Sequence, residues 1–307
     1  MSKKSQRGRY LASLVKHGVL IPGNAKGVYG KNSDFEDLVV RLELLLTKLV
    51  PRKDVEYLRF PPVMDRSWLV AQGYLAKFPH LLGTIHAFSG SDSEHEELLR
   101  KVAAHKEWAH SQVPTELALV PAACLPVYPA IARRGPLSPR GVTIDVQSFC
   151  FRHEPSVDPM RMQSFRMREY IRMGSAHQTM RHVHSMMDKA KELMSALLLP
   201  YRSDTATDPF FGKRATLLSE SQREQSLKSE LSVPLFDNAA PVACASFNSH
   251  QTYFAEVWNI RTHTGELAHT ACVGFGLERI VLALFCVHGF DHSRWNSKIR
   301  AALGMKS

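Results

Sequence analysis

The sequence contains no apolar run of about 18 residues, so no segment is long enough to cross a bilayer as a helix. Its first ten residues are basic, but only a short apolar stretch follows them, at residues 11–15. A secretory signal needs a longer apolar core and a cleavage site. These absences predict a cytoplasmic protein that does not enter the membrane.

Cysteine is also scarce, with five residues in a chain of 307. An odd number, wide spacing and a chain of this size argue against a disulfide framework, which leaves core thiols or metal ligands. No internal repeat or low-complexity tract is visible. The five cysteines are Cys124, Cys150, Cys244, Cys272 and Cys286.

Positive charge, by contrast, is plentiful. The formal net charge is +10 and the pI is about 9.4. Such a balance favours an anionic partner: nucleotide phosphates, nucleic acid or an acidic protein. A basic surface that is merely solvated is the alternative interpretation.

Hydrophobic periodicity indicates an α+β fold. Apolar residues at helical spacing predict an amphipathic helix over 34–50, with Ser33 and Glu36 as its capping box. Residues 142–154 and 164–174 predict two strands of an antiparallel hairpin with a long tip. Strands paired by hairpins, with helices around them, suggest an antiparallel sheet. The other predicted elements are strands at 56–62, at 116–124 and, as a pair, within 241–262; helices at 65–72, 94–106, 175–199 and 274–289; an exposed helix or insertion at 213–231; and an irregular segment at 1–32.

The first segment that carries chemistry is Phe151-Arg152-His153-Glu154, at the end of a predicted strand. An arginine in this place can bind a phosphate or a carboxylate in bidentate fashion. Glu154, two residues further on, points to the same face of a strand. Taken alone, the pair is also typical of a surface ion pair.

The second segment is Gly274-Phe275-Gly276-Leu277-Glu278-Arg279, before an apolar helix. Its glycines allow a ligand to approach the backbone closely, and Arg279 falls in the first turns of the helix. The Rossmann spacing is missing and no GK[ST] follows, so it is neither a dinucleotide fingerprint nor a P-loop. An ordinary strand-to-helix turn is the alternative.

In this order, the two segments resemble motifs 2 and 3 of the class II aminoacyl-tRNA synthetases. The helix at 34–50 and the strand after it resemble their motif 1, which builds a homodimer interface. The resemblance implies an antiparallel sheet flanked by helices. We expect an N-terminal extension at 1–33 and a single catalytic domain at 34–307, with a polar helical insertion at about 200–232.

Cys124, Glu169 and Cys272 narrow this resemblance to the zinc-dependent, archaeal-type seryl-tRNA synthetases. There a cysteine, a glutamate on the motif 2 strand and a cysteine before motif 3 hold one zinc ion. Three protein ligands leave a fourth position open for the substrate α-amino group. Spacing alone does not predict this site, because two cysteines 148 positions apart are usually core residues. Cys150, Cys244 and Cys286 are expected in the core.

The resemblance also implies the ATP site, with Mg²⁺ bridging phosphate oxygens. Arg152 and Arg279 are the expected catalytic residues, with Arg152 on the α-phosphate and the substrate carboxylate and Arg279 on the γ-phosphate. Glu154 would bind the adenine amino group and Phe165 would stack near the base. The expected ATP-binding residues are Arg152, Glu154, Phe165, Arg166, Ser246 and Arg279, and the expected amino-acid-binding residues are Glu169 and Asn248.

The segment before motif 1 indicates which acceptor receives the activated amino acid. Only about 33 residues lie there, with no heptad pattern and no basic domain, whereas a seryl-tRNA synthetase has a large tRNA-binding domain. The chain therefore resembles the amino acid:[carrier protein] ligases, which load glycine or alanine, rather than serine, onto the phosphopantetheine thiol of a small carrier protein.

Two alternatives remain open: a seryl-type synthetase that charges tRNA, and a non-catalytic paralogue that serves as a binding module. A carrier protein is typically acidic, so a basic ligase would attract it. The hypothetical docking residues are Lys213, Arg214, Arg223 and Lys228 in the polar segment, and Arg133, Arg134 and Arg140.

Overall fold

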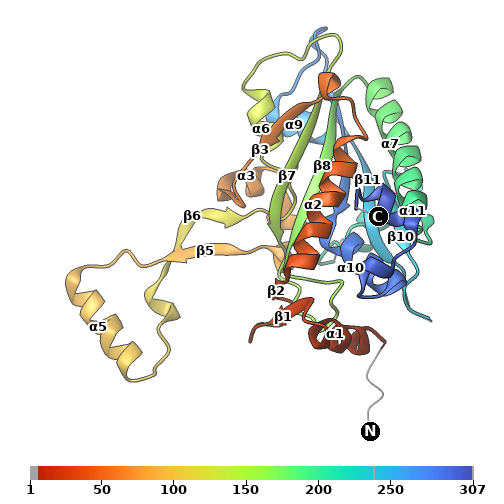
Figure 1. Cartoon of the computed structure of the whole chain (residues 1–307). Helices are drawn as coiled ribbons and strands as arrows, with labels where there is room; N and C mark the ends of the chain where they lie inside the picture. Colours follow the sequence, from red (N-terminus) through yellow and green to blue (C-terminus); the bar gives the residue numbers. More distant parts are fainter. Residues whose placement is uncertain (1–5, 214, 238, 306–307) are drawn as a thin grey trace.

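The fold is built on a seven-stranded sheet (Figure 1). The computed structural model describes residues 6–213, 215–237 and 239–305. Only the edge strand β3 runs parallel to its neighbour; every other pairing in the sheet is antiparallel. The strands, in spatial order, are β3 (Glu56–Arg59), β7 (Val142–Phe151), β8 (Ser164–Gly174), β12 (His269–Gly276), β11 (Val242–Gln251), β10 (Lys228–Val233) and β9 (Arg202–Thr205).

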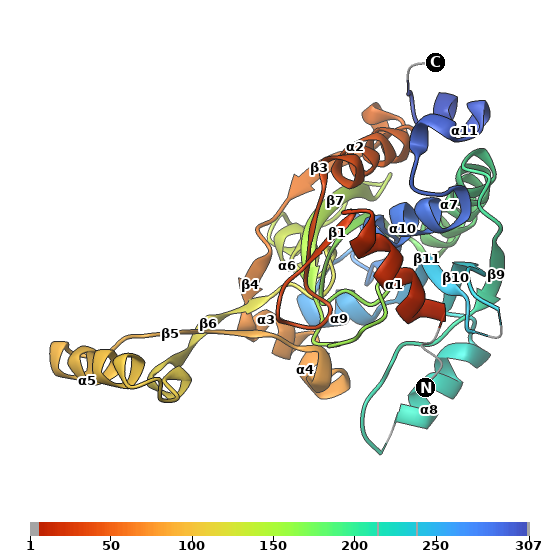
Figure 2. The ribbon, with the colours of Figure 1, turned by 60° about the horizontal axis from the view of Figure 1, so that its bottom comes forward.

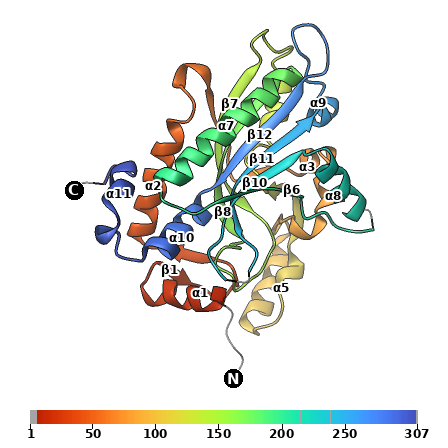
Figure 3. The ribbon, with the colours of Figure 1, turned by 90° about the vertical axis from the view of Figure 1, so that its right-hand side faces the viewer.

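Three long helices cover one face of this sheet: α2 (Ser33–Thr47), α7 (Ala176–Ala196) and α10 (Leu277–His288) (Figure 3). The face of α2 that meets α10 is fully apolar, and α10 is buried along nearly its whole length. Tyr170 on β8 donates a hydrogen bond to Leu46 O at 2.6 Å. The main hydrophobic core therefore lies between these helices and the sheet.

Shorter elements surround the opposite face. They are α3 (Arg66–Ala71), α4 (Tyr74–Lys77), α6 (Val127–Ala132) and α9 (Tyr253–Trp258), with α8 (Ala215–Glu224) near the far edge. A second hydrophobic cluster forms under them. The remaining elements are α1 (Gln6–Lys16), β1 (Leu20–Pro22), β2 (Tyr29–Lys31), α11 (Ser297–Ala302) and the 3₁₀ turns η1 (Arg52–Asp54), η2 (Pro79–Leu81), η3 (Ala109–Ser111) and η4 (His292–Arg294).

An arm projects from the body (Figure 2). It is formed by residues 84–119: the strands β5 (Thr84–Ala87) and β6 (Val113–Leu119), with the helix α5 (Asp92–Ala103) between them. At its base β6 also pairs with β4 (Val63–Asp65). No residue of α5 is buried, so the body does not stabilise this helix by packing.

The predicted fold class is confirmed, and so are the helix at 34–50 and the hairpin of β7 and β8. Three local predictions were wrong. Residues 253–258 form the helix α9 instead of a strand. The N-terminal segment contains α1, whose Tyr10 donates a hydrogen bond to Leu282 O at 2.6 Å in the core. Asn32, not Ser33, caps α2 by accepting from Phe35 N at 3.0 Å.

The segment predicted as a polar helical insertion at about 200–232 is helical, among its described residues, only in α8. Its ends are the strands β9 and β10, which complete the main sheet. Lys228, expected on an exposed helix, is buried on β10 instead. Arg214 lies outside the described residues. None of the described helices has the length and apolar character needed to span a membrane.

Candidate active site

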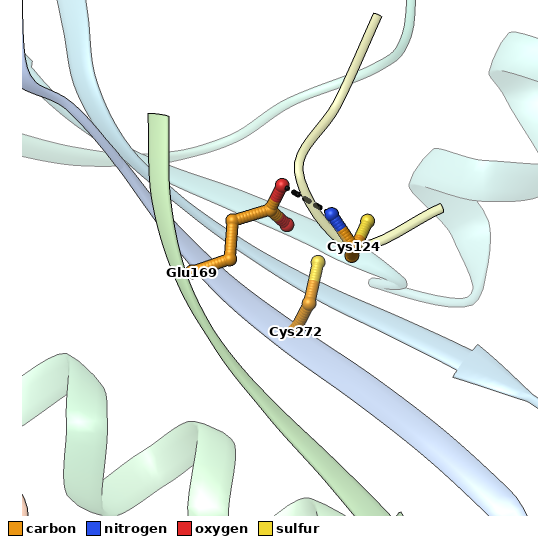
Figure 4. Close-up of side chains that lie close together, drawn as sticks. All are labelled: Cys124, Glu169 and Cys272. Carbon is orange, nitrogen blue, oxygen red and sulfur yellow. Dashed lines mark hydrogen bonds between the residues drawn. The ribbon is translucent and has the colours of Figure 1, made fainter. Parts of the chain in front are cut away.

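Cys124, Glu169 and Cys272 converge in the interior (Figure 4). Glu169 and Cys272 lie on the neighbouring strands β8 and β12, and Cys124 lies on the loop after β6. Their ligand atoms lie within 4.8 Å of one another, and each residue is at most 5% exposed. Glu169 Oε1 also accepts a hydrogen bond from Cys124 N at 3.0 Å, which fixes the carboxylate.

These three side chains suit a divalent metal. A hydrogen bond with Cys272, burial and the charge of Glu169 raise the pKa of the Cys124 thiol well above its ordinary value. The hydrogen bond with Cys124 lowers the pKa of Cys272, but burial and Glu169 raise it by more. A bound divalent cation would favour the thiolate form of both cysteines. Two sulfurs and one carboxylate match zinc, and three protein ligands leave one position for a substrate.

A cavity of about 510 Å³ extends from this cluster. Gly274 forms part of its floor, where a Cβ atom would lie 3.4 Å from Glu169 Cγ and Ser246 Oγ, so the glycine keeps this floor open. Of the residues expected to bind ATP or the amino acid, the cavity lining includes Arg152, Phe165, Glu169, Ser246, Asn248 and Arg279.

Two arginines bring positive charge into this cavity. Arg152 follows β7, donates to Pro121 O at 3.0 Å and lies over the Phe165 ring at 5.5 Å. Arg279 donates to Met160 O at 2.9 Å and to Ala243 O at 3.1 Å. Burial and the nearby charge of Arg152 lower the pKa of Arg279. The two positively charged guanidinium groups repel each other, so a bound anion between them would be favourable. Phosphate groups would supply such an anion.

Two expected ATP-binding residues lie outside the cavity lining. Glu154 accepts from Arg161 at 3.0 Å. Arg166 donates to Glu278 at 2.8 Å and to Glu36 at 2.5 and 2.9 Å. Successive residues of β8 face opposite sides of the sheet, so Phe165 and Glu169 face the cavity while Arg166 faces α2.

The sequence interpretation missed several residues of the cavity wall. His250 follows Ser246 and Asn248 at intervals of two on β11, and this strand periodicity could have revealed it. Lys77 lies 3.9 Å from the centroid of the Tyr253 ring. Asp208 accepts from Lys228 at 2.7 Å, a contact between distant segments that no local pattern predicts.

Solved structures show the same fold. The M. kandleri SerRS, crystallised with A. aeolicus tRNASec, superposes with a TM-score of 0.81 at 20% identity, over 99% of this chain and 61% of that one. The cytoplasmic serine-tRNA ligase of Naegleria fowleri, in complex with AMP, gives a TM-score of 0.71 at 13% identity, over 97% of this chain and 66% of that one. The chain therefore has the class II aminoacyl-tRNA synthetase fold.

Curated relatives identify the family. Amino acid–[acyl-carrier-protein] ligase 1 of Bradyrhizobium diazoefficiens is 42% identical over 97% of this chain and 90% of its own length. Ligase 2 of the same organism is 40% identical over 96% of this chain. The type-2 serine–tRNA ligase of Methanococcus aeolicus is 28% identical over 47% of this chain. No protein-family model matches. The chain belongs to the amino acid–[acyl-carrier-protein] ligases.

Proposed function

We propose that this enzyme activates a small amino acid with ATP, glycine first and alanine second, and transfers it to the phosphopantetheine thiol of a carrier protein. The observation that carries this proposal is one cavity that joins the Cys124, Glu169 and Cys272 cluster to Arg152 and Arg279. The relatives support the acceptor, because the carrier-protein ligases match nearly the whole chain and the serine–tRNA ligases 46–59% of it.

Cys124, Glu169 and Cys272 would hold zinc, which supplies an electrophilic position for the substrate α-amino nitrogen. ATP enters as its magnesium complex. Arg152 and Arg279 hold the phosphates and stabilise the charge that develops between them. A carboxylate oxygen of the amino acid attacks the α-phosphorus in line, and pyrophosphate leaves. No general base is needed, because the carboxylate is already ionised, so positioning and electrostatics carry the first step.

In the second step the sulfur of the carrier thiol bonds to the adenylate carbonyl carbon, the bond from that carbon to the phosphate oxygen breaks so that AMP leaves, and the thiol proton passes to solvent. The same cavity has room beyond the cysteine cluster, between α4 and α8. Gln72 and Tyr74 belong to the lining of this cavity, and Gln72 Oε1 and Tyr74 OH are buried without a hydrogen-bond partner among the described residues; burial raises the pKa of Tyr74 to about 12. These polar groups suit a chain that contains amides, as phosphopantetheine does.

The carrier would dock beside α8, because Leu218 and Gln222 of this helix already line the cavity. Lys213 precedes this helix, and Arg223 lies in its last turn. Arg134, another candidate, already binds Glu56 at 2.7 and 2.8 Å. Charge reversal at Lys213 and Arg223 should weaken aminoacyl transfer and spare adenylation.

Homodimer formation is the second part of the proposal. Val40 and Leu44 on α2 are 53% and 61% exposed, and β3 beside them is the sheet edge. The arm at 84–119 has six acidic and three basic residues, so its net charge is −3 and the rest of the chain carries +13. An acidic arm with exposed apolar side chains, such as Leu99, complements a second copy of this basic body.

Amino-acid-dependent exchange of pyrophosphate into ATP tests the activation step. We expect exchange with glycine, less with alanine and least with serine. Alanine differs from glycine by one methyl group, which is worth only about 1–3 kcal/mol in discrimination, so exchange with these two amino acids should differ in rate rather than in presence. Absence of exchange with all three would indicate a binding module and refute the proposal.

A further inference from the structure

A chain of hydrogen bonds surrounds the sulfur of Cys272. Asn248 Nδ2 donates to Cys272 Sγ at 3.4 Å, and His250 Nε2 lies 3.7 Å from the same sulfur. On the other side of the ring, His250 Nδ1 lies 3.3 Å from Thr270 Oγ1 and 3.4 Å from Tyr128 OH. Thr270 and Tyr128 are fully buried, so these partners are fixed.

The neighbours of the His250 ring determine which nitrogen carries the proton. A thiolate bound to a metal has no proton and can only accept a hydrogen bond. His250 Nε2 must therefore carry the hydrogen in order to contact Cys272 Sγ. The Thr270 hydroxyl can donate to Nδ1 and so favours this same tautomer. Tyr128 OH lies on the same Nδ1 side of the ring and also favours this tautomer when it donates to Nδ1.

His250 is not one of the ligands. Only the donor atoms of Cys124, Glu169 and Cys272 form a group within 4.8 Å of one another among the described residues. His250 approaches that group through Cys272 alone. Phe254 holds the imidazole in place, with ring centroids 4.9 Å apart in an edge-on arrangement. The ring thus lies one layer behind the ligands.

We propose that His250 is a positioning residue for the metal: its Nε2–H, oriented by Thr270, donates to Cys272 Sγ and, with Asn248, holds this thiolate in the geometry that binds zinc. The inference rests on the proposed zinc site. Groups that hydrogen-bond to metal ligands typically contribute 10–100-fold to metal affinity. We therefore expect a loss of about that size when the donor is removed.

Zinc retention against a competing chelator tests this role in the full-length protein. His250→Leu removes the donor and should bind zinc about 10–100-fold more weakly. His250→Gln places an amide N–H near the position of Nε2 and should recover most of the affinity. His182→Leu is the matched control, because His182 lies on α7, on the other face of the sheet, and hydrogen-bonds to a backbone carbonyl, Tyr170 O at 3.3 Å. It should retain zinc as the wild type does.

The absorption spectrum of the cobalt-substituted protein gives a second measurement. A residue that only stabilises the fold would not change this spectrum. A hydrogen bond to a thiolate lowers the energy of its lone pairs, so its loss should shift the sulfur-to-cobalt charge-transfer band to longer wavelength. Thr270→Val should shift the band in the same direction, and Thr270→Ser should restore it.

These outcomes distinguish the positioning role of His250 from the zinc site itself. If His250→Leu binds zinc as tightly as the wild type, or if His250→Gln is no better than His250→Leu, the positioning role is refuted while the zinc site stands. If the wild-type protein binds neither zinc nor cobalt, the zinc site itself fails and the inference fails with it.

Discussion

Replacement of Arg166 by methionine distinguishes an arginine that holds the fold from one that holds the substrate. Arg166 donates to Glu278 and to Glu36, and so ties β8 to α10 and α2. Methionine keeps the apolar stem and removes the charge. The family resemblance assigned Arg166 to ATP, whereas its observed contacts assign it to this network.

The size of the effect follows from what the substitution leaves behind. Glu278 is 1% exposed and would lose its main partner. It keeps the backbone N–H of Arg166 at 2.6 Å and Lys31 at 3.5 Å. Breaking a buried ion pair lowers the free energy of unfolding by about 3–5 kcal/mol. Because Glu278 keeps these two contacts, we expect a loss at the lower end of that range, about 3 kcal/mol. With an unfolding entropy of about 2.1 cal/mol/K per residue, Tm should fall by roughly 5 °C.

Thermal unfolding and pyrophosphate exchange, measured on the same variant, test this reasoning. Arg166→Met should lower Tm and leave the KM for ATP close to that of the wild type. Arg279→Met is the comparison, because Arg279 lines the cavity, and it should lower exchange by at least ~10²-fold. A large rise in the KM for ATP at an unchanged Tm in Arg166→Met would refute the assignment.

Three further predictions follow from the site and the surface. Cys272→Ser should lose zinc and amino-acid activation together, as elemental analysis and pyrophosphate exchange would report; full exchange without zinc contradicts the metal role. Burial raises the pKa of Asp208, but the charge and hydrogen bond of Lys228 outweigh it and hold that pKa below its usual value. The contact therefore stabilises the fold above about pH 4 and is lost as the pH falls through the lowered pKa, so Asp208→Asn should be less stable than the wild type at pH 7 and nearly equal in acid. A stability gap that does not change with pH would contradict this. Leu99→Glu with Val102→Glu on the arm should weaken self-association in sedimentation experiments, and an unchanged dimer would exclude the arm from the interface.

Helices and strands with a clear hydrophobic periodicity were predictable from the sequence. The segment of β8 alternates bulky and charged residues over its whole length, that of β7 alternates in part, and α2 shows an uninterrupted apolar face. Residues 253–258 were mistaken for a strand because tyrosine, phenylalanine, valine and tryptophan favour strands locally. In the fold, α9 instead packs Phe254 onto Tyr128 with ring centroids 3.9 Å apart, and this tertiary contact overrides the local preference.

The candidate site was only partly accessible to sequence reasoning. Cys124 and Cys272 lie far apart in the chain, and family resemblance, not spacing, brought them together with Glu169. The resemblance names Arg166 as an ATP-binding residue but does not specify which face of β8 its side chain lies on; in the fold it lies on the α2 face. His250 and Thr270 carry no motif, and their role depends on contacts across β11 and β12 that only the fold reveals.

Transfer of the activated amino acid tests the central claim most directly. The enzyme is incubated with labelled glycine and ATP and then offered a carrier protein with its phosphopantetheine, the same carrier without it, or tRNA. We expect a thioester-linked label on the phosphopantetheinylated carrier alone. A label on tRNA, or equal labelling of the two carrier forms, would contradict it.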